Sequence, residues 1–327
     1  MVSTIIKWLL VIIGIKLIVV LITIPFTPDP RRDLAVREEM YRKFNPNAVF
    51  IGTSRTLYAL DSRLFDSLNR NETRTYNMGL FNLPASQAFN IAERIIERDT
   101  AVRNIFIELS ALDYNTILLS PTRVLPDFVF RTKVMAGCST IEVSDKIESF
   151  LAGLNTSLYQ MLSIAPQIVL AKKAMRTSSD PIEGTPWLRP DGHQPVNLGG
   201  TNQTAYIHRS KKSTAQMMAA RQTKEANQYY IDQINGLILS ASKRKKKITF
   251  CFPNNLLHTE FLILSQVAPY IPEHNLIRLP ADSRFEALFD PGNSFDAHHL
   301  NQQGAKIYTR FLQEEFSKRS HPLTDNI

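Results

Sequence analysis

Glycine and cysteine are scarce in this chain, which has 12 glycines and two cysteines among its 327 residues. Cys138 and Cys251 lie far apart, and neither belongs to a Cys-x-x-Cys pair. The cysteines therefore indicate neither a metal site nor a disulfide framework. No sequence period recurs along the chain, which excludes solenoids and other repeat architectures.

A nucleic-acid-binding signature is also missing, although the formal net charge is +8. The sequence has no basic helix with interleaved aromatic residues and no RNA- or DNA-binding motif, so we expect no nucleic acid as a partner. The excess of positive charge indicates attraction to an anionic surface, either lipid or polymer.

A long apolar run is present at the N-terminus, over residues 5–24. About 20 residues of helix cross the hydrocarbon core of a bilayer, and the proline-rich stretch 25–30 stops the helix. A cleavable signal peptide is the alternative. It would need a shorter apolar core and a small-x-small cleavage site, which residues 26–29 do not supply. We therefore predict a single-pass membrane anchor over residues 1–26, followed by a linker over 27–44.

Charges around the anchor favour a cytoplasmic domain. Lys7 precedes the apolar core, whereas five basic residues follow the anchor, at positions 31, 32, 37, 42 and 43. The positive-inside rule would leave the large domain in the cytoplasm, although long domains translocate largely regardless of flanking charge. Lys16 falls near the middle of the run. Its ammonium either snorkels to the membrane surface or meets a polar group on a membrane partner.

Strand-like and helix-like segments alternate from Asn45 onward. This alternation predicts an α/β domain over residues 45–320 with a five-stranded, mostly parallel sheet covered on both faces. A short tail follows at 321–327. We expect strands at 48–51, 74–78, 104–109, 248–252 and 275–279, and helices at 57–68, from Pro84 as the first helical position, at 144–176, 213–240, 259–267 and 302–317.

Residues 177–212 are treated as an insertion in this domain, because the stretch from 177 to 206 is polar and rich in turn residues. A loop of this length inside a compact domain is usually functional or disordered. We expect it to form a lid that contacts substrate, and Trp187 and His193 are its candidate contact residues.

The first predicted strand runs directly into Gly52-Thr53-Ser54. Such a serine lies either at the N-cap of the following helix or at the carboxyl edge of the sheet, where ligands of α/β proteins bind. A serine nucleophile needs a base, and a histidine base needs a third group that fixes its tautomer. Asp296 and His299 follow the last strand and are three residues apart, so one loop can present both. His298 is the competing base.

An acyl-transfer site also needs hydrogen-bond donors for the oxyanion. The N–H groups of Ser54 and Gly79 are candidates, because both residues follow strands and glycine permits close backbone approach. The amide of a nearby asparagine would complete the oxyanion hole.

The three motifs Gly52-Thr53-Ser54, Asn77-Met78-Gly79 and Asp296-x-x-His299, in this order, resemble those of the SGNH (GDSL-like) hydrolase superfamily. The resemblance covers roughly residues 45–316. It implies a flavodoxin-like three-layer fold and a Ser-His-Asp mechanism without a metal or another cofactor. Ser54 matches the nucleophile of that family, Gly79 the oxyanion glycine of the second block, and Asp296 and His299 the last block.

The third block of the family, Gly-x-Asn-Asp, has no clean match after the third predicted strand, where the chain continues as Ser110-Ala-Leu-Asp-Tyr-Asn115. Asn115 and Asn82 are the alternative amide donors. The anchor, the Gly-Thr-Ser-Arg form and the insertion look most like membrane-anchored SGNH-like proteins that modify cell-surface polymers. These include partners of membrane-bound O-acyltransferases in polysaccharide O-acetylation and teichoic-acid D-alanylation. That subgroup implies an extracytoplasmic catalytic domain.

The resemblance thus implies a membrane-anchored serine acyltransferase or esterase, for which an acylated cell-surface polysaccharide is the substrate. The alternative is a non-catalytic SGNH-like subunit that binds polymer or a membrane-bound O-acyltransferase partner. In that case the departure in the third block would reflect lost chemistry.

Overall fold

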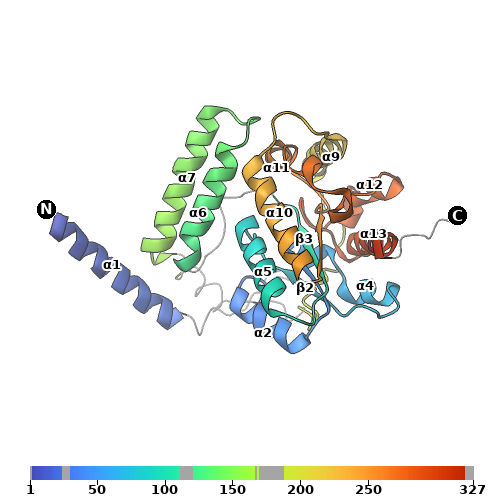
Figure 1. Cartoon of the computed structure of the whole chain (residues 1–327), viewed down its shortest axis with the longest axis horizontal. Helices are drawn as coiled ribbons and strands as arrows, with labels where there is room; N and C mark the ends of the chain where they lie inside the picture. The colour runs from blue at the N-terminus through green and yellow to red at the C-terminus, as the bar shows by residue number, and fades with distance from the viewer. Residues whose placement is uncertain (1, 24–29, 111–120, 166–167, 169–187, 321–327) are drawn as a thin grey trace.

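Five parallel strands form a single sheet in the computed structural model, which describes residues 2–23, 30–110, 121–165, 168 and 188–320 (Figure 1). The strand order is β2-β1-β3-β4-β5, and every neighbouring pair is parallel. The predicted α/β class and the parallel sheet are therefore confirmed. The strands are β1 (Ala48–Gly52), β2 (Thr75–Gly79), β3 (Asn104–Glu108), β4 (Lys247–Cys251) and β5 (Leu276–Ile277).

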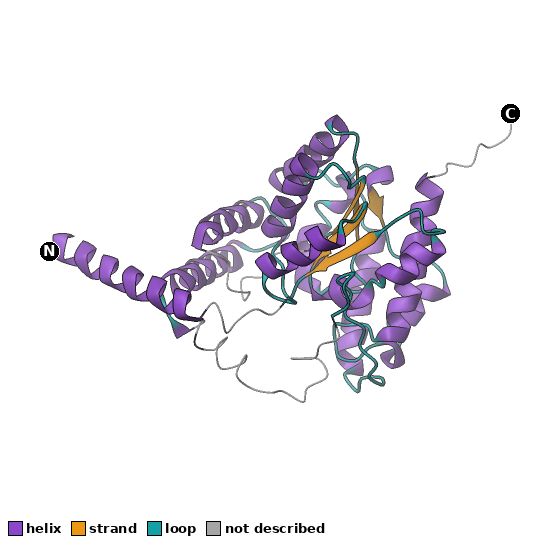
Figure 2. Cartoon of the chain, turned by 90° about the horizontal axis from the view of Figure 1, so that it is seen from below, coloured by secondary structure: helices purple, strands orange, loops and turns teal. Residues whose placement is uncertain are grey.

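Helices surround this sheet, whose strands lie inside the molecule (Figure 2). The α-helices in the described residues are α1 (Val2–Thr23), α2 (Leu34–Phe44), α3 (Ser54–Ala59), α4 (Ser62–Leu68), α5 (Ala85–Arg98), α6 (Pro121–Ala136), α7 (Val143–Leu162), α9 (Thr204–Ala219), α10 (Gln228–Lys243), α11 (His258–Leu264), α12 (Ser283–Leu288) and α13 (Gln302–Ser320).

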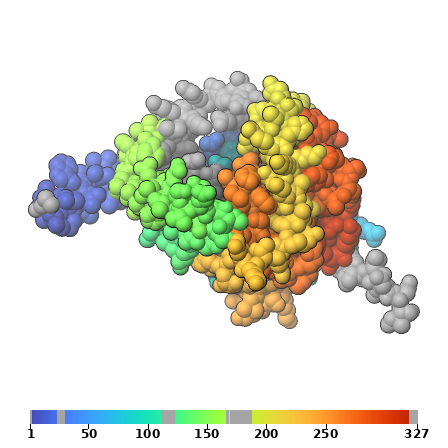
Figure 3. Space-filling model, turned by 90° about the horizontal axis from the view of Figure 1, so that it is seen from above, coloured from blue at the N-terminus to red at the C-terminus, as the bar shows by residue number. Residues whose placement is uncertain are grey.

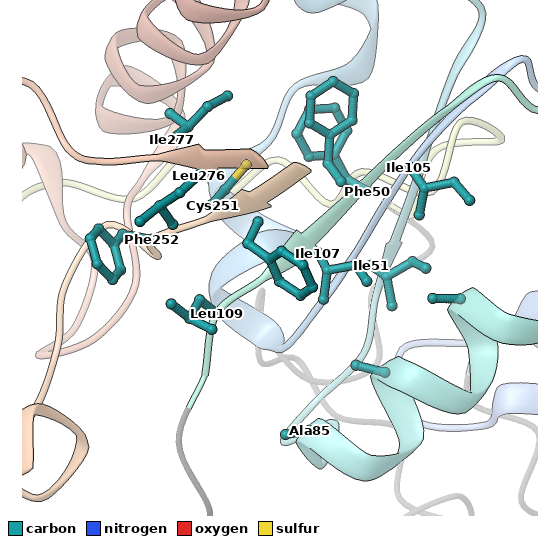
Figure 4. Close-up of a cluster of buried hydrophobic side chains, with 14 of the residues drawn as sticks. Phe50, Ile51, Ala85, Ile105, Ile107, Leu109, Cys251, Phe252, Leu276 and Ile277 are labelled. Carbon is teal, nitrogen blue, oxygen red and sulfur yellow. The ribbon is translucent and has the colours of Figure 1, made fainter. Parts of the chain in front are cut away.

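Aromatic side chains join helices to the two faces of the sheet. Phe50 of β1 is in register with Phe106 of β3, and their rings stack with centroids 4.1 Å apart. Phe65 of α4 and Phe316 of α13 pack against Phe106. The next residue along β3 points to the opposite face, where Phe250 of β4 contacts Phe89 of α5. Figure 4 shows buried apolar side chains on and next to β1, β3, β4 and β5, together with Ala85 of α5.

Two predicted helices are each interrupted. The segment 57–68 forms two helices because Asp61 caps a new one: its carboxylate accepts a hydrogen bond from the Leu64 N–H at 3.3 Å. The segment 213–240 is also not one helix, since α9 ends at Ala219 and Asn227 caps α10. Of the predicted helix 144–176, α7 accounts for 143–162, and residues 169–176 lie outside the described ones.

The predicted linker 27–44 is wrong for its second half, because α2 begins at Leu34 and packs beside β2. Arg37 and Tyr41 of α2 are buried. The Arg37 guanidinium donates hydrogen bonds to backbone oxygens of Asn77, Gly79 and Gly192. A further correction concerns Pro84, which is the N-cap of α5 and not its first helical residue.

The predicted lid is only partly described, and its described part is fixed to the domain. Trp187 and the rest of 177–187 lie outside the described residues, and residues from Thr204 onward belong to α9. The Asn77 N–H donates to the Asp191 carbonyl at 2.8 Å. The predicted substrate contact of His193 is not supported, because His193 is fully buried and its Nε2 lies 3.2 Å from the Tyr58 carbonyl oxygen.

Helix α1 extends away from the sheet on the side of α6 and α7 (Figure 1). It is the one described helix that is long and apolar enough to cross a membrane, over Val2–Ile22. A signal sequence near the N-terminus would meet the same criterion of length and hydropathy. The predicted tail, 321–327, lies outside the described residues.

Candidate active site

Ser54 is the first residue of α3, directly after the turn that leaves β1. Thr53, not Ser54, is the N-cap: its Oγ1 accepts a hydrogen bond from the Arg55 N–H at 3.2 Å. The hydroxyl of Ser54 is therefore not needed for capping. Gly52 makes the turn possible, because a Cβ there would lie 2.1 Å from Thr56 Oγ1 and 2.6 Å from Glu108 Oε2.

The structure brings Ser54, His299 and Asp296 together although 245 residues separate the serine from the histidine. Ser54 Oγ lies 2.8 Å from His299 Nε2. On the other side of the ring, His299 Nδ1 lies 2.8 Å from Asp296 Oδ2 and 3.0 Å from Oδ1. This is the geometry in which a carboxylate orients a histidine and the histidine takes a proton from a serine.

Backbone N–H groups of the same turn also hold the carboxylate of Asp296 in place. The N–H groups of His298 and His299 donate to its Oδ1 at 2.7 and 2.9 Å. Burial raises the pKa of Asp296, but the hydrogen bond and charge of His299 outweigh burial and leave the pKa below its ordinary value. Asp296 is therefore a carboxylate at neutral pH, as the orienting role requires.

His298 points elsewhere. Its ring contacts Tyr206 with centroids 4.6 Å apart, and its carbonyl oxygen accepts hydrogen bonds from the side chains of Asn255 and Asn254 at 2.7 and 3.3 Å. Burial and then the neighbouring His299 lower the pKa of His298. Of the two candidate bases, the geometry selects His299.

Aromatic rings hold the imidazole of His299 from two sides. Phe295 stacks on it with an interplanar angle of 14° and centroids 5.5 Å apart. Tyr58 of α3 meets it edge-on at 5.1 Å. The ring is thereby confined to the orientation that directs Nε2 at Ser54.

The structure contradicts the role predicted for the Gly79 N–H. This group donates to Asn77 Oδ1 at 2.8 Å, so it is not available to an oxyanion. The same asparagine donates from Nδ2 to the carbonyls of Thr56 and Leu60 at 2.8 and 2.9 Å. Glycine is required at position 79 for packing, since a Cβ would lie 2.3 Å from the Leu57 nitrogen. Asn77 and Gly79 thus fix α3 to β2.

The other two oxyanion candidates do not complete the site in the described part of the chain. Asn82 is exposed, with a left-handed φ of 51°, and no hydrogen bond joins it to Ser54 or His299. Asn115 lies outside the described residues. The N–H of Ser54 is in the first turn of α3, where helices lack an internal acceptor. The described residues provide no partner for it.

A buried ion network lies behind Ser54, and sequence reasoning missed it. Glu108, the last residue of β3, accepts hydrogen bonds from the N–H of Thr53 at 2.9 Å and from the hydroxyl of Thr56 at 2.6 Å. Arg55 contacts Glu108 at 3.0 Å and Glu260 at 2.8 Å. The one sequence signal was an acidic residue at the end of an otherwise apolar strand.

Arg55 keeps its charge in this network. Burial lowers the pKa of its guanidinium, but Glu260 and Glu108 together raise it above the ordinary value. A buried charge is tolerated when it is paired and hydrogen-bonded. The network thus anchors the turn that carries Ser54 to β3 and to the start of α11.

A metal site is not indicated among the described residues, in which no three His, Cys, Asp or Glu side chains form a group that could hold an ion. Comparison of the chain with models of protein families, with curated proteins and with solved structures finds no match. The geometry of the site therefore carries the functional argument.

Proposed function

We propose that this protein is a membrane-anchored SGNH-type serine acyl hydrolase or O-acyltransferase. The observation that carries the proposal is the hydrogen-bonded chain from Ser54 through His299 to Asp296, with 2.8 Å at each link. The strand order 2-1-3-4-5 is that of flavodoxin-like folds, which supports a flavodoxin-like three-layer arrangement. Their ligands bind at the switch point between β1 and β3, and Ser54 directly follows β1.

The proposed chemistry begins with an ester substrate. Ser54 Oγ attacks the carbonyl carbon while His299 Nε2 takes the hydroxyl proton, and Asp296 stabilises the imidazolium that results. The tetrahedral intermediate collapses, the bond to the leaving alcohol breaks, and His299 returns the proton to that alcohol. Water or a sugar hydroxyl then attacks the acyl-enzyme, and His299 again takes the proton. The bond from the acyl carbon to Ser54 Oγ breaks, and His299 returns the proton to that oxygen. Water gives hydrolysis, and a sugar hydroxyl gives transfer.

The backbone N–H of Ser54 is the oxyanion donor that the described residues offer. It belongs to the nucleophile itself, so its position relative to Oγ is fixed by the first turn of α3. Removing one preorganised oxyanion donor costs about 10²–10³ in kcat in a well-studied serine protease. With the Gly79 N–H occupied, the proposal requires a second donor from another part of the chain or from a partner.

The proposed substrate is an acylated cell-surface polysaccharide, and the proposed partner is a membrane-bound O-acyltransferase. Three features support this: the apolar helix α1, the positive net charge, which suits an anionic surface, and the resemblance to membrane-anchored SGNH-like proteins of polymer modification. On this proposal α1 remains as a single-pass anchor and the catalytic domain is extracytoplasmic.

A second candidate function is a non-catalytic subunit that binds polymer or the acyltransferase. The hydrogen bond that occupies the Gly79 N–H favours it, because that group would otherwise serve the oxyanion. The third family block, for which Asn115 was a candidate amide donor, has no clean match in the sequence. This departure also favours a non-catalytic subunit. The two functions differ in whether Ser54 is reactive.

A fluorophosphonate probe measures that difference directly, because it labels a serine only when its hydroxyl is activated. We expect the full chain to be labelled in membranes and Ser54→Ala not to be labelled. His299→Ala should reduce the labelling rate on the order of 10³-fold or more. His298→Ala should stay near the wild-type rate, since only the backbone of His298 contacts Asp296.

The controls separate loss of chemistry from loss of fold. All three variants should unfold at temperatures close to wild type, because none removes a large buried apolar side chain. If the wild-type protein is not labelled although it is folded, the enzymatic proposal fails and the non-catalytic subunit is favoured. If His298→Ala lowered the labelling rate more than His299→Ala, His298 and not His299 would be the base.

A further inference from the structure

Helix α7 carries a stripe of large apolar side chains that faces solvent. At about 100° per residue, the stripe spans an arc of about 100°, which is typical of an amphipathic helix. Its members are between 37% and 70% exposed. They are Val143, Ile147, Phe150, Leu151, Leu154, Leu158 and Met161.

The stripe lies outside the buried side of α7, and Phe150 at its edge touches α6, the helix that packs against α7. Gly153 is the buried residue of α7, and the partly buried Thr156, Ser157 and Gln160 lie near it on the helix surface. The side that meets the protein is therefore small and polar, and the apolar side is outside. An ordinary surface helix has the reverse arrangement.

The apolar surface continues onto α6. Phe128 contacts Phe150 with ring centroids 5.4 Å apart, and Leu125 and Val129 of α6 are 63% and 40% exposed. Contiguous apolar patches that extend over two helices mark interaction sites in soluble domains. We call this surface, formed by the stripe of α7 with Leu125, Phe128 and Val129, the hairpin face.

The end of α7 is joined to α1. Lys16 is only 4% exposed, and its ammonium donates a hydrogen bond to the carbonyl of Ser163, the C-cap of α7. The C-terminus of a helix carries partial negative charge on its unpaired carbonyls. The charge of Lys16, in the middle of the apolar run, is thus compensated by this helix end, and α1 lies beside α7 in the space-filling view (Figure 3).

The position of this contact sets the depth of α7. Six residues separate Lys16 from Ile22, the end of the apolar span, which corresponds to about 9 Å along the helix axis. Amphipathic helices at a membrane surface bury their apolar face roughly 5–10 Å into the boundary of headgroups and acyl chains. A bilayer crossed by α1 therefore reaches the level at which α7 ends.

We propose that the hairpin of α6 and α7 lies on the membrane and that lipid covers the hairpin face. The occupant is a bilayer because α1, the proposed anchor, contacts the end of α7, and the depth of that contact matches that of an interfacial helix. The net charge of +8 suits an anionic leaflet. The inference rests on the proposed anchoring by α1, but not on the chemistry of Ser54.

The test uses the full chain in nanodiscs of phosphatidylcholine and phosphatidylglycerol. An environment-sensitive fluorophore is attached to Leu154→Cys, in the middle of the stripe, or to Ala152→Cys. Ala152 is also exposed and lies about 200° around the helix from Leu154. The two native cysteines are buried and serve as the unlabelled background. We expect emission from position 154 to be blue-shifted and quenched by spin-labelled lipid, and emission from position 152 to resemble that in water.

Two results would overturn the proposal. Equal, water-like emission from both positions would show that the hairpin face is not covered. A blue shift at position 154 without quenching by spin-labelled lipid would show that protein, such as a second copy of the chain, covers it. Neither result depends on fluorophosphonate labelling, so this proposal and the enzymatic one can fail separately.

Discussion

At the scale of single residues, the turn that carries Ser54 is held by a carboxylate that lies far from it in the sequence. Glu108 binds the N–H groups and hydroxyls of Thr53 and Thr56, which flank Ser54 on the turn. It touches neither Ser54 nor His299 in the described contacts, so we regard it as a positioning residue. A shift of the nucleophile by 1 Å can cost about 10²-fold in rate.

Glu108→Gln should therefore slow the reaction without weakening substrate binding. The amide N–H₂ cannot accept from Arg55 or from the Thr53 N–H, so one side of the network is lost. We expect kcat and the labelling rate to fall by about 10–100-fold while KM changes little. The free energy of unfolding should fall by about 2–4 kcal/mol, since a charge-assisted buried contact is lost.

Glu260→Gln is the matched control. Glu260 pairs with the other edge of the Arg55 guanidinium and accepts from the Leu257 N–H. It does not contact the Thr53 or Thr56 side chains. It should lower stability comparably and leave the labelling rate much closer to wild type. If both variants reduced the rate equally, a general loss of stability would explain the effect and Glu108 would have no positioning role.

The sequence was sufficient to predict which motif residues form the site, but not the contacts that hold them in place. The spacing of Asp296 and His299 and the place of Ser54 after a strand were sufficient to group these three residues. The N–H of Gly79 was predicted wrongly as an oxyanion donor. The hydrogen bond that it donates to Asn77 Oδ1 forms only in the folded chain. Glu108 could not be assigned, since nothing in the sequence pairs it with the turn at Thr53.

At the scale of secondary-structure elements, α3 is held between β2 and the turn after β1. Gly79 permits this close approach: a Cβ there would lie 2.3 Å from the backbone nitrogen of Leu57 and 2.6 Å from its Cα. Both atoms belong to the helix backbone, so neither can rotate away. Any side chain at position 79 must displace α3, and with it Ser54.

Gly79→Ala should consequently lower both stability and activity. We expect a loss of about 2–4 kcal/mol, within the range for strong steric strain, and a loss of labelling that exceeds the loss of folded protein. Thermal unfolding and fluorophosphonate labelling of the same preparation measure the two effects. Gly236→Ala is the control, because this exposed glycine of α10 has nothing within 4 Å of an added Cβ.

The control should behave in the opposite direction. Alanine in an exposed helix interior is favoured over glycine by about 1 kcal/mol, so Gly236→Ala should be neutral or stabilising and fully labelled. A Gly79→Ala protein with wild-type stability and labelling would contradict the close packing of β2 on α3.

Helix boundaries were less predictable than strands, for physical reasons. The parallel strands are short apolar runs, and the predicted starts of all five lie within one residue of the observed ones. The break at Asp61 was not, because apolar spacing continues across the cap. The sequence predicts a linker where α2 lies, and this segment is rich in charge. Nη2 of its buried Arg37 donates hydrogen bonds to carbonyls of β2 and of the segment after Arg189, which are distant in sequence.

At the scale of the whole molecule, the alternation of strands and helices was sufficient to predict a parallel sheet, but not its strand order. The order 2-1-3-4-5 places β1 inside the sheet, with β2 on one side and β3 on the other. The ends of β1 and β3 then lie side by side, which places Glu108 behind Ser54. On the proposed anchoring, the contact between Lys16 of α1 and the end of α7 ties the membrane anchor to the domain.

Lys16 should therefore control the orientation of the domain on the membrane. Lys16→Leu should ease insertion of α1, because a lysine at the centre of a span costs about 2.5–3.5 kcal/mol on insertion scales. It should also remove the hydrogen bond to the Ser163 carbonyl. We expect a narrow distribution of distances between spin labels at Leu10→Cys of α1 and Ala152→Cys of α7 in nanodiscs, and a broad one after Lys16→Leu.

Lys7→Leu removes the same charge from the same helix and is the matched control. Lys7 lies near the start of α1 and is exposed, so its loss should leave the distance distribution narrow. The pair of variants thus distinguishes a specific tie between α1 and α7 from a general effect of charge on insertion. An unchanged, narrow distribution in Lys16→Leu would mean that apolar packing alone holds the two helices. A broad distribution in the unsubstituted chain would mean that α1 tethers the domain without orienting it.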